Sequence, residues 1–166
     1  MANESSTGDT ALDDVEKRVR QWLLEEGWQL DAESRPDYKF AIVADDGSGR
    51  KLIVSQQSQK ADRITIEASV SLSDDHVKKM EKLQQKKRRD FLWDLRFELL
   101  QTDVEFTGVG ESLQRVVVGQ PIFYDALSKD VFMQRVSEVK KALLLVLWKV
   151  AQLMEESPSQ MGFLKG

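Results

Sequence analysis

The sequence predicts a single α+β domain, in which a twisted antiparallel sheet of five strands is covered by three helices. Three observations support this class. The apolar spacing changes from helical to alternating and back along the chain, the connections between successive predicted strands are short, and 41% apolar and 31% charged residues are globular values. The predicted order is α-β-β-β-α-β-β-α, with the domain over residues 10–156 and flexible tails at 1–9 and 157–166.

The first helix is predicted over residues 11–26, where apolar residues recur at helical spacing. Thr10 offers a capping oxygen, and Gly27 can take the left-handed conformation that ends a helix. Three strands follow, at 38–42, 52–54 and 63–70, and the third alternates between apolar and polar residues, so one face of it is expected to be exposed. The short connections predict an antiparallel meander.

A second helix is predicted to begin after Ser73, whose hydroxyl can cap it, and to continue to about Gln101 without Gly or Pro. At 1.5 Å per residue its length would be roughly 40 Å, which is long for this domain. Its first half is polar and its second half is apolar. Two arrangements are open: the helix bends in the middle, or its charged half projects beyond the sheet.

Two further strands are predicted, at 104–107 and 113–124, with a turn at 108–110 between them. Val116, Val117 and Val118 in succession predict a strand that is covered on both faces. Ser128 caps a third helix at about 129–156, whose apolar stripe centres on Leu143.

The two long helices carry more apolar residues than one subunit is expected to bury. Leu145 and Trp148 point away from the apolar stripe of the third helix, and five apolar residues of the second helix cannot all face one sheet. The predicted partner surface comprises Phe91, Trp93, Leu95, Phe97, Leu100, Leu145 and Trp148. An exposed apolar patch of several hundred Å² marks a partner surface, so a homodimer is expected. The alternative is that the first and third helices lie side by side and cover one another, with Trp148 in that contact.

A basic run stands out in a chain whose net charge is −4. It comprises Lys78, Lys79, Lys82, Lys86, Lys87, Arg88 and Arg89, and with Glu81 its sum is +7 − 1 = +6. A solvated helix face, an acidic partner or second copy of the chain, and nucleic acid are the three alternatives. Nucleic acid is not expected, because the whole chain is acidic and no aromatic residue interrupts the run.

The sequence predicts no catalytic, cofactor or metal site, and therefore no enzyme. It has no cysteine, and its one histidine, His76, lies in a predicted first helical turn beside two aspartates, where a surface role is expected. The alternative class is a small-molecule or nucleotide-binding domain, possibly an enzyme, that uses Asp103 or Asp125 with Arg115 in a cleft.

A cytoplasmic location without membrane contact is also expected. The chain begins without the basic and apolar segments of a secretory signal. Its longest apolar run, at 142–148, is far shorter than the roughly 20 residues that span a bilayer.

The element order, together with the acidic, cysteine-free composition, resembles the type III secretion chaperone-like superfamily, including its YbjN-type members. The resemblance covers residues 11–156 and is carried by the stretches at 22–28, 63–66 and 121–125. It implies a homodimer joined through the middle helix, the capture of an extended segment of a client protein, and no catalytic motif. Gln56, Gln57, Ser58 and Gln59 would suit a sheet edge that binds such a segment by strand addition, and a polar loop is the alternative.

Overall fold

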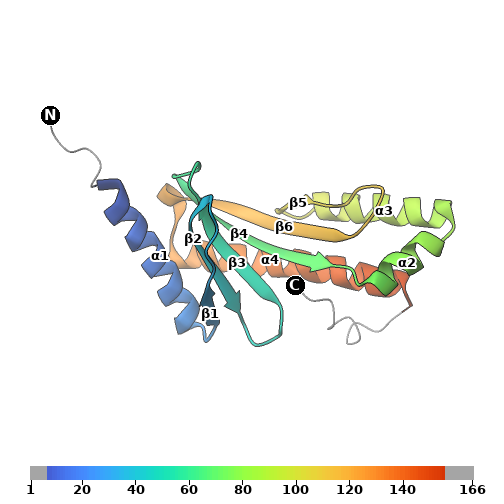
Figure 1. Ribbon diagram of the computed structural model, residues 1–166, viewed down its shortest axis with the longest axis horizontal. Helices are drawn as coiled ribbons and strands as arrows, with labels where there is room; N and C mark the ends of the chain where they lie inside the picture. Colours follow the sequence, from blue (N-terminus) through green and yellow to red (C-terminus); the bar gives the residue numbers. More distant parts are fainter. Residues whose placement is uncertain (1–6, 156–166) are drawn as a thin grey trace.

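The computed structural model describes residues 7–155, with side chains from residue 14 onward, and they form an antiparallel sheet covered by helices (Figure 1). The elements are α1 Thr7–Glu25, β1 Gln29–Ala32, β2 Tyr38–Asp45, β3 Lys51–Gln57, β4 Arg63–Ser71, α2 Asp74–Lys82, α3 Gln85–Leu100, β5 Glu105–Thr107, β6 Arg115–Phe123, η1 Tyr124–Ala126 and α4 Lys129–Leu153. The predicted α+β class is confirmed. The predicted counts are wrong, because the described chain has six strands and four α-helices.

The boundaries of the predicted domain differ slightly from those of the described elements. Helix α1 begins at Thr7, within the predicted N-terminal tail, and ends before Gly27, whose φ of 80° is the left-handed stop that the sequence predicts. The remaining residues of the two predicted tails, 1–6 and 157–166, lie outside the described part of the chain.

The sheet has the strand order β1-β2-β3-β4-β6-β5, and every neighbouring pair is antiparallel. Strands β2, β3 and β4 form the predicted meander. After β4 the chain leaves the sheet for α2 and α3, and it returns as β5 at the edge before β6 fills the place beside β4. Placing β6 in the interior pairs all nine of its residues with β4, from Arg115 opposite Ser71 to Phe123 opposite Arg63.

Strand β1 is the strand that the sequence prediction missed. It is four residues long and pairs with β2 at the edge of the sheet, Leu30 lying opposite Ala44. Its side chains are exposed apart from the half-buried Leu30. A four-residue edge strand with one apolar anchor gives too short an alternation to be recognised.

The predicted second helix is broken, which confirms the bent arrangement of the two that were open. Leu83 ends α2 and Gln84 precedes α3, and both have extended backbones, with ψ of 149° and 138°. Helix α2 is capped as predicted, because the Ser73 hydroxyl accepts a hydrogen bond from the backbone amide of His76 at 3.3 Å. The break lets α3 take a direction of its own.

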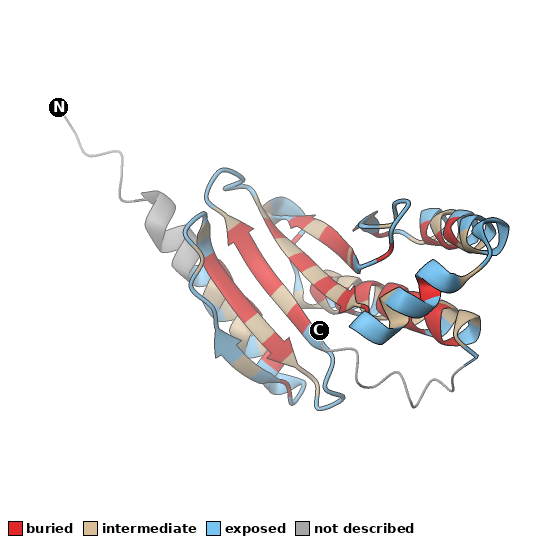
Figure 2. Ribbon diagram, turned by 45° about the vertical axis from the view of Figure 1, so that its right-hand side comes forward, coloured by how far each residue is buried: buried red, intermediate tan, exposed pale blue. Residues whose placement is uncertain are grey.

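The helices pack against one face of the sheet. Helix α4 runs along β4 and β6 and spans most of the molecule, while α1 packs on β1 and β2 at one end (Figure 1). Buried residues alternate with more exposed ones along the strands (Figure 2). In β4 the buried residues are Ile64, Ile66, Ala68 and Val70, as the alternation predicts. The prediction that β6 is covered on both faces is wrong, since Val117 is only half-buried between the buried Val116 and Val118.

The glutamine-rich segment, which ends β3 and enters the following turn, is not a sheet edge. Strand β3 lies between β2 and β4, and Gln56 is fully buried on the helix-covered face. Its side-chain oxygen accepts a hydrogen bond from the hydroxyl of Tyr124, and burial raises the pKa of Tyr124 to about 12. Gln56 and Gln57 pair with Phe40 and Tyr38 of β2, and β4 is the neighbour of β3 on its other side, so these two residues do not lie on an outer strand of the sheet.

Candidate functional site

Helices α3 and α4 lie antiparallel beside one another at the end of the molecule opposite α1 (Figure 1). The Oε1 atom of Glu98 in α3 lies 2.5 Å from the Nζ atom of Lys149 in α4. Toward its start α3 faces the end of α4, where Phe91 and Leu153 line a common groove. The core side of α3 carries Leu92, Leu95 and Leu99, at the spacing of one helical face.

The outward side of this helix pair is apolar. Phe97 and Trp148 each precede one member of the Glu98–Lys149 ion pair, and they are 56% and 55% exposed. Successive side chains of a helix point about 100° apart around its axis. Glu98 and Lys149 point toward one another, and because the two helices are antiparallel, the residue before each of them points to the same side of the pair. Phe97 and Trp148 therefore project together, away from the sheet.

Trp93 extends this surface by one helical turn. Its ring stacks on that of Phe97, with the ring centroids 5.7 Å apart and an angle of 27° between the planes. Trp93 is 49% exposed, and Leu100, near the end of α3, is 68% exposed. A stacked aromatic pair that is half in water is a costly arrangement for a subunit that stays alone.

The structure brings together only part of the predicted partner surface. Trp93, Phe97, Leu100 and Trp148 are exposed, whereas Phe91 and Leu145 are half-buried and pack against the core. Leu95 was wrongly included, because it is fully buried on the core side of α3. The spacing of Leu92, Leu95 and Leu99 was the signal that separates it from the outward residues. We use "the outer face" below for Trp93, Phe97, Leu100 and Trp148.

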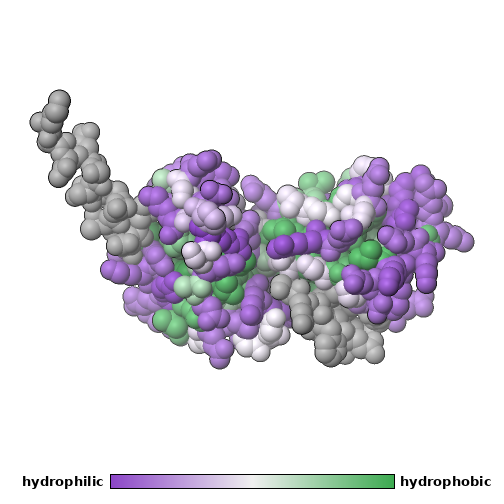
Figure 3. Space-filling view, viewed as in Figure 1, coloured by the Kyte–Doolittle hydropathy of each residue, from purple (hydrophilic) through white to green (hydrophobic). Residues whose placement is uncertain are grey.

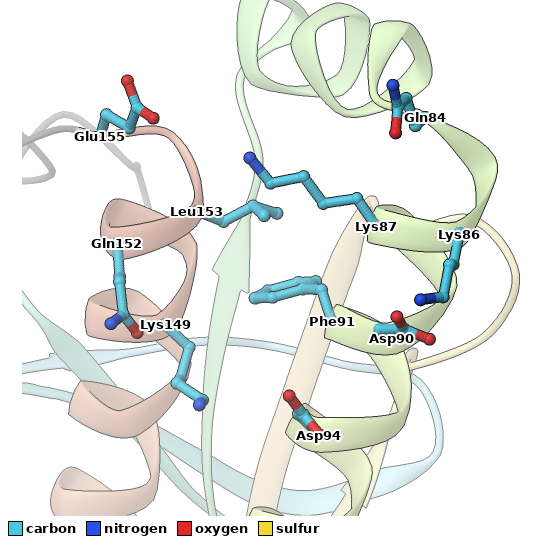
Figure 4. Close-up of a pocket in the computed structure, with 10 residues that line it drawn as sticks. All are labelled: Gln84, Lys86, Lys87, Asp90, Phe91, Asp94, Lys149, Gln152, Leu153 and Glu155. Carbon is cyan, nitrogen blue, oxygen red and sulfur yellow. The ribbon is translucent and has the colours of Figure 1, made fainter.

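A groove of about 520 Å³ separates the start of α3 from the end of α4 (Figure 4). Lys87 extends from α3 toward α4 above Phe91 and Leu153, and Asp94 and Lys149 lie deeper between the helices. Three lysines and three carboxylates line the groove: Lys86, Lys87, Lys149, Asp90, Asp94 and Glu155. Since the charges balance, the groove favours neither an anion nor a cation.

The basic run does not form one helix face, because the break after Lys82 divides it. Lys78, Lys79 and Lys82 belong to α2, and the other four basic residues belong to the first turns of α3. Hydrophilic residues gather at this end of the molecule (Figure 3). Within α3 the lysines and arginines separate further: Lys86 and Lys87 line the groove toward α4, while Arg88 and Arg89 line a hollow on the opposite flank.

That hollow, of about 530 Å³, lies between α3 and the loop that joins β5 to β6. Arg96 helps to form it. The Nε atom of Arg96 donates a hydrogen bond to the carbonyl oxygen of Val109 at 2.9 Å, and its guanidinium lies 4.8 Å from the ring centroid of Trp93. Arg96 and Glu111 were missed at the sequence level. Arg96 follows Arg89 by seven residues, two helical turns, and this spacing could have indicated a shared flank.

The acidic and basic residues of the alternative prediction are not brought together. Arg115 begins β6, where a terminal guanidinium nitrogen donates a hydrogen bond to the hydroxyl of Ser69 at 3.2 Å, and Asp125 follows the other end of the same strand. The backbone oxygen of Asp103 accepts a hydrogen bond from the side chain of Gln120. The predicted cleft with Asp103 or Asp125 beside Arg115 is therefore not formed.

His76 lies in the first turn of α2, beside the serine that caps this helix. The Nδ1 atom of His76 lies 2.8 Å from the hydroxyl oxygen of Ser73, the residue that caps α2. Over the part of the chain whose side chains are described, no three histidine or carboxylate side chains gather in a way that could hold a metal ion.

A model of the family of uncharacterized conserved proteins called DUF2299 matches residues 15–150. The match covers most of the chain. This chain belongs to the DUF2299 family. The matched span includes all of β1 to β6, as well as α3 and the outer face.

One solved structure resembles this DUF2299 chain over most of its length. It is the crystal structure of an uncharacterized protein from Methanothermobacter thermautotrophicus, with a TM-score of 0.76 and 29% sequence identity, and the match covers 82% of this chain and 96% of that chain. No match was found among the curated proteins. Within residues 7–155, no helix of this DUF2299 member has the length and apolar character needed to cross a membrane.

Proposed function

We propose that this chain is a non-enzymatic, cytoplasmic protein-binding protein that forms a homodimer through the outer face of α3 and α4. The exposed stack of Trp93 on Phe97 carries the proposal. Aromatic residues that bury their rings in a contact are the typical anchors of protein interfaces. Phe97 and Trp148 project to one side from two different helices, so the outer face presents a surface rather than a single exposed residue.

A second copy of the chain is the partner that we propose for the outer face. Two copies related by a two-fold axis can pack the exposed aromatic residues of one outer face against those of the other. Such a contact is isologous, as most homodimer interfaces are. The acidic side chains of α3 are engaged within one copy, because Glu98 pairs with Lys149 and Asp94 lines the groove toward α4.

Capture of an extended client segment, which the resemblance to the secretion chaperones implies, remains a prediction. Strand β5 pairs only with Val117, Val118 and Gly119, so the last residues of β6 lie beyond the end of their edge neighbour. That stretch of β6 is where an added strand would pair. The outer face lies on the helices, so a dimer formed through it leaves the sheet accessible.

The experiment that tests the dimer replaces the aromatic stack. We expect Trp93→Ala with Phe97→Ala to weaken self-association by more than about 2 kcal/mol, because two anchors are lost from each copy. Light scattering during size-exclusion chromatography gives the mass. Leu24→Ala is the matched control: Leu24 is 60% exposed on α1, at the other end of the molecule, and its removal should leave the mass unchanged. A double variant with the same mass as the unaltered chain would refute the proposal.

A further inference from the structure

A second hollow adjoins the one beside α3, on the side toward α2. The second hollow, of about 290 Å³, is lined by the apolar residues Val77, Met80 and Leu113, and also by Glu81 and Ser112. Arg88 and Glu111 line both hollows, so the two adjoin. We call the two hollows together the depression: its end at α3 is basic, its end at α2 is largely apolar with one carboxylate, and its size is in the range of small-molecule sites.

Three arginines line the basic end, Arg88, Arg89 and Arg96. Among the described residues, the guanidinium groups of Arg88 and Arg89 make no hydrogen bond or ion pair, and that of Arg96 donates only through its Nε atom, to the carbonyl oxygen of Val109. Glu111 is the only carboxylate that lines this end, so the local formal charge is +3 − 1 = +2. Three cations held close together repel one another unless an anion joins them.

The presence of arginine rather than lysine in this hollow indicates which kind of anion it can bind. The basic run contains both lysines and arginines, but only arginines line this hollow, while Lys86 and Lys87 line the opposite groove. The planar guanidinium binds carboxylate and phosphate oxygens through two parallel hydrogen bonds, which the ammonium group of lysine cannot do. The anchoring of Arg96 by Val109 and by the ring of Trp93 holds one of these groups in place before any ligand arrives.

We propose that this depression binds a small molecule with a terminal oxyanion, a phosphate or a carboxylate, attached to an apolar body. The oxyanion lies among Arg88, Arg89 and Arg96. The body lies along Leu92 and extends over Val77, Met80 and Leu113. Glu111, which lines both hollows, and Glu81, at the α2 end, repel a second negative charge and so select ligands that carry their charge at one end. This inference does not depend on the dimer.

Isothermal titration calorimetry at low salt tests the site with four probes: phenyl phosphate, benzoate, inorganic phosphate and phenol. Phenyl phosphate should bind more tightly than inorganic phosphate, because the ring reaches the apolar end, and phenol should not bind. The comparison of phenyl phosphate with benzoate decides which oxyanion is preferred.

Two double variants with the same charge loss separate a site from general attraction. Arg88→Gln with Arg89→Gln should weaken the binding of phenyl phosphate at least tenfold, whereas Lys86→Gln with Lys87→Gln should change it less than threefold. Glu111→Gln should strengthen binding several-fold, because it removes the repelling carboxylate, and this variant gives a gain that misfolding cannot imitate. Equal losses in the two double variants, or the absence of any heat with both phenyl phosphate and benzoate at millimolar concentration, would overturn the inference.

Discussion

Asp46 joins the turn after β2 to α4 through a single carboxylate. Its oxygens accept hydrogen bonds from the Nζ atom of Lys140 and from the hydroxyl and the amide of Ser48, the last at 3.0 Å. Burial alone would raise the pKa of Asp46, but these hydrogen bonds outweigh it and lower the pKa from 3.8 to about 2. Lys140 also lies 5.2 Å from the ring centroid of Trp28, so the pair fixes several side chains at this end of the sheet.

A pH-dependent loss of stability follows from this lowered pKa. The folded state binds the proton of Asp46 less tightly than the unfolded state, so the stabilisation is complete above about pH 4 and disappears as the pH falls toward 2. We expect Asp46→Asn to lower the free energy of unfolding by about 1–2 kcal/mol at pH 6, with allowance for solvent screening. Urea unfolding at pH 6 and at pH 2.5 measures the difference.

At pH 2.5 most of the difference between Asp46→Asn and the unaltered chain should be gone. Asp31→Asn, at the exposed edge of the sheet, is the control and should change the stability little at either pH. A difference for Asp46→Asn that stays constant between the two pH values would contradict the assigned role of the carboxylate.

Gly108 is the residue that the turn between β5 and β6 requires. Its φ is 91°, and a Cβ atom at this position would lie 1.9 Å from the backbone oxygen of Arg115. We expect Gly108→Ala to cost at least about 2 kcal/mol of stability, since both the backbone conformation and the contact must change. Gly110→Ala is the matched control in the same loop, because nothing lies within 4 Å of its Cβ position. Thermal unfolding of both variants should show a large loss for Gly108→Ala only, and equal effects would contradict the turn geometry.

Among the elements, α3 begins without a side-chain cap. Gln84 occupies the N-cap position of α3 in an extended conformation, but its side chain makes no capping hydrogen bond. We expect Gln84→Ser to stabilise the protein by about 0.5–1 kcal/mol, because a serine hydroxyl can accept a hydrogen bond from the first turn. Chemical denaturation measures the gain.

Ser73→Ala provides the reverse comparison at α2, where the hydroxyl does cap the helix. That variant should lose about 1 kcal/mol. A neutral Gln84→Ser together with a destabilising Ser73→Ala would show that α3 does not begin where the structure places it.

The sequence predicts most of the elements because their patterns are long. The alternation of 63–70 and the apolar stripe of α4 extend over many residues, and each matches one face of a strand or helix. The break between α2 and α3 was open at the sequence level, since neither Gly nor Pro marks it. The break follows from tertiary packing, which buries Met80 in α2 and Leu92 in α3 against the rest of the core.

Four residues of the candidate partner surface could be predicted from helical spacing, because exposed apolar positions are visible on a helical wheel. Leu95 could have been separated from them, because it shares the spacing of the core-facing Leu92 and Leu99. The hollow with Arg88, Arg89 and Arg96, by contrast, was hidden. It is formed against the loop that contains Glu111, and contacts between a helix and a distant loop leave no periodic signal in the sequence.

In the whole molecule, α3 packs against the core with one side and against α4 with one flank. Its other flank faces the arginine-lined hollow, and its outward side carries the stacked aromatic residues. The same helix therefore presents a surface suited to a second copy of the chain and a depression suited to an anionic small molecule. A ligand in the depression would contact Trp93 and so would lie at the border of the proposed dimer interface.

Sedimentation equilibrium of the unaltered chain over a wide concentration range measures the self-association that we propose. We expect a particle of about 38 kDa, twice the 19.0 kDa chain, that dissociates only on strong dilution. A mass of 19.0 kDa that persists at millimolar concentration would contradict it, because Trp93, Phe97 and Trp148 would then remain in water without a partner.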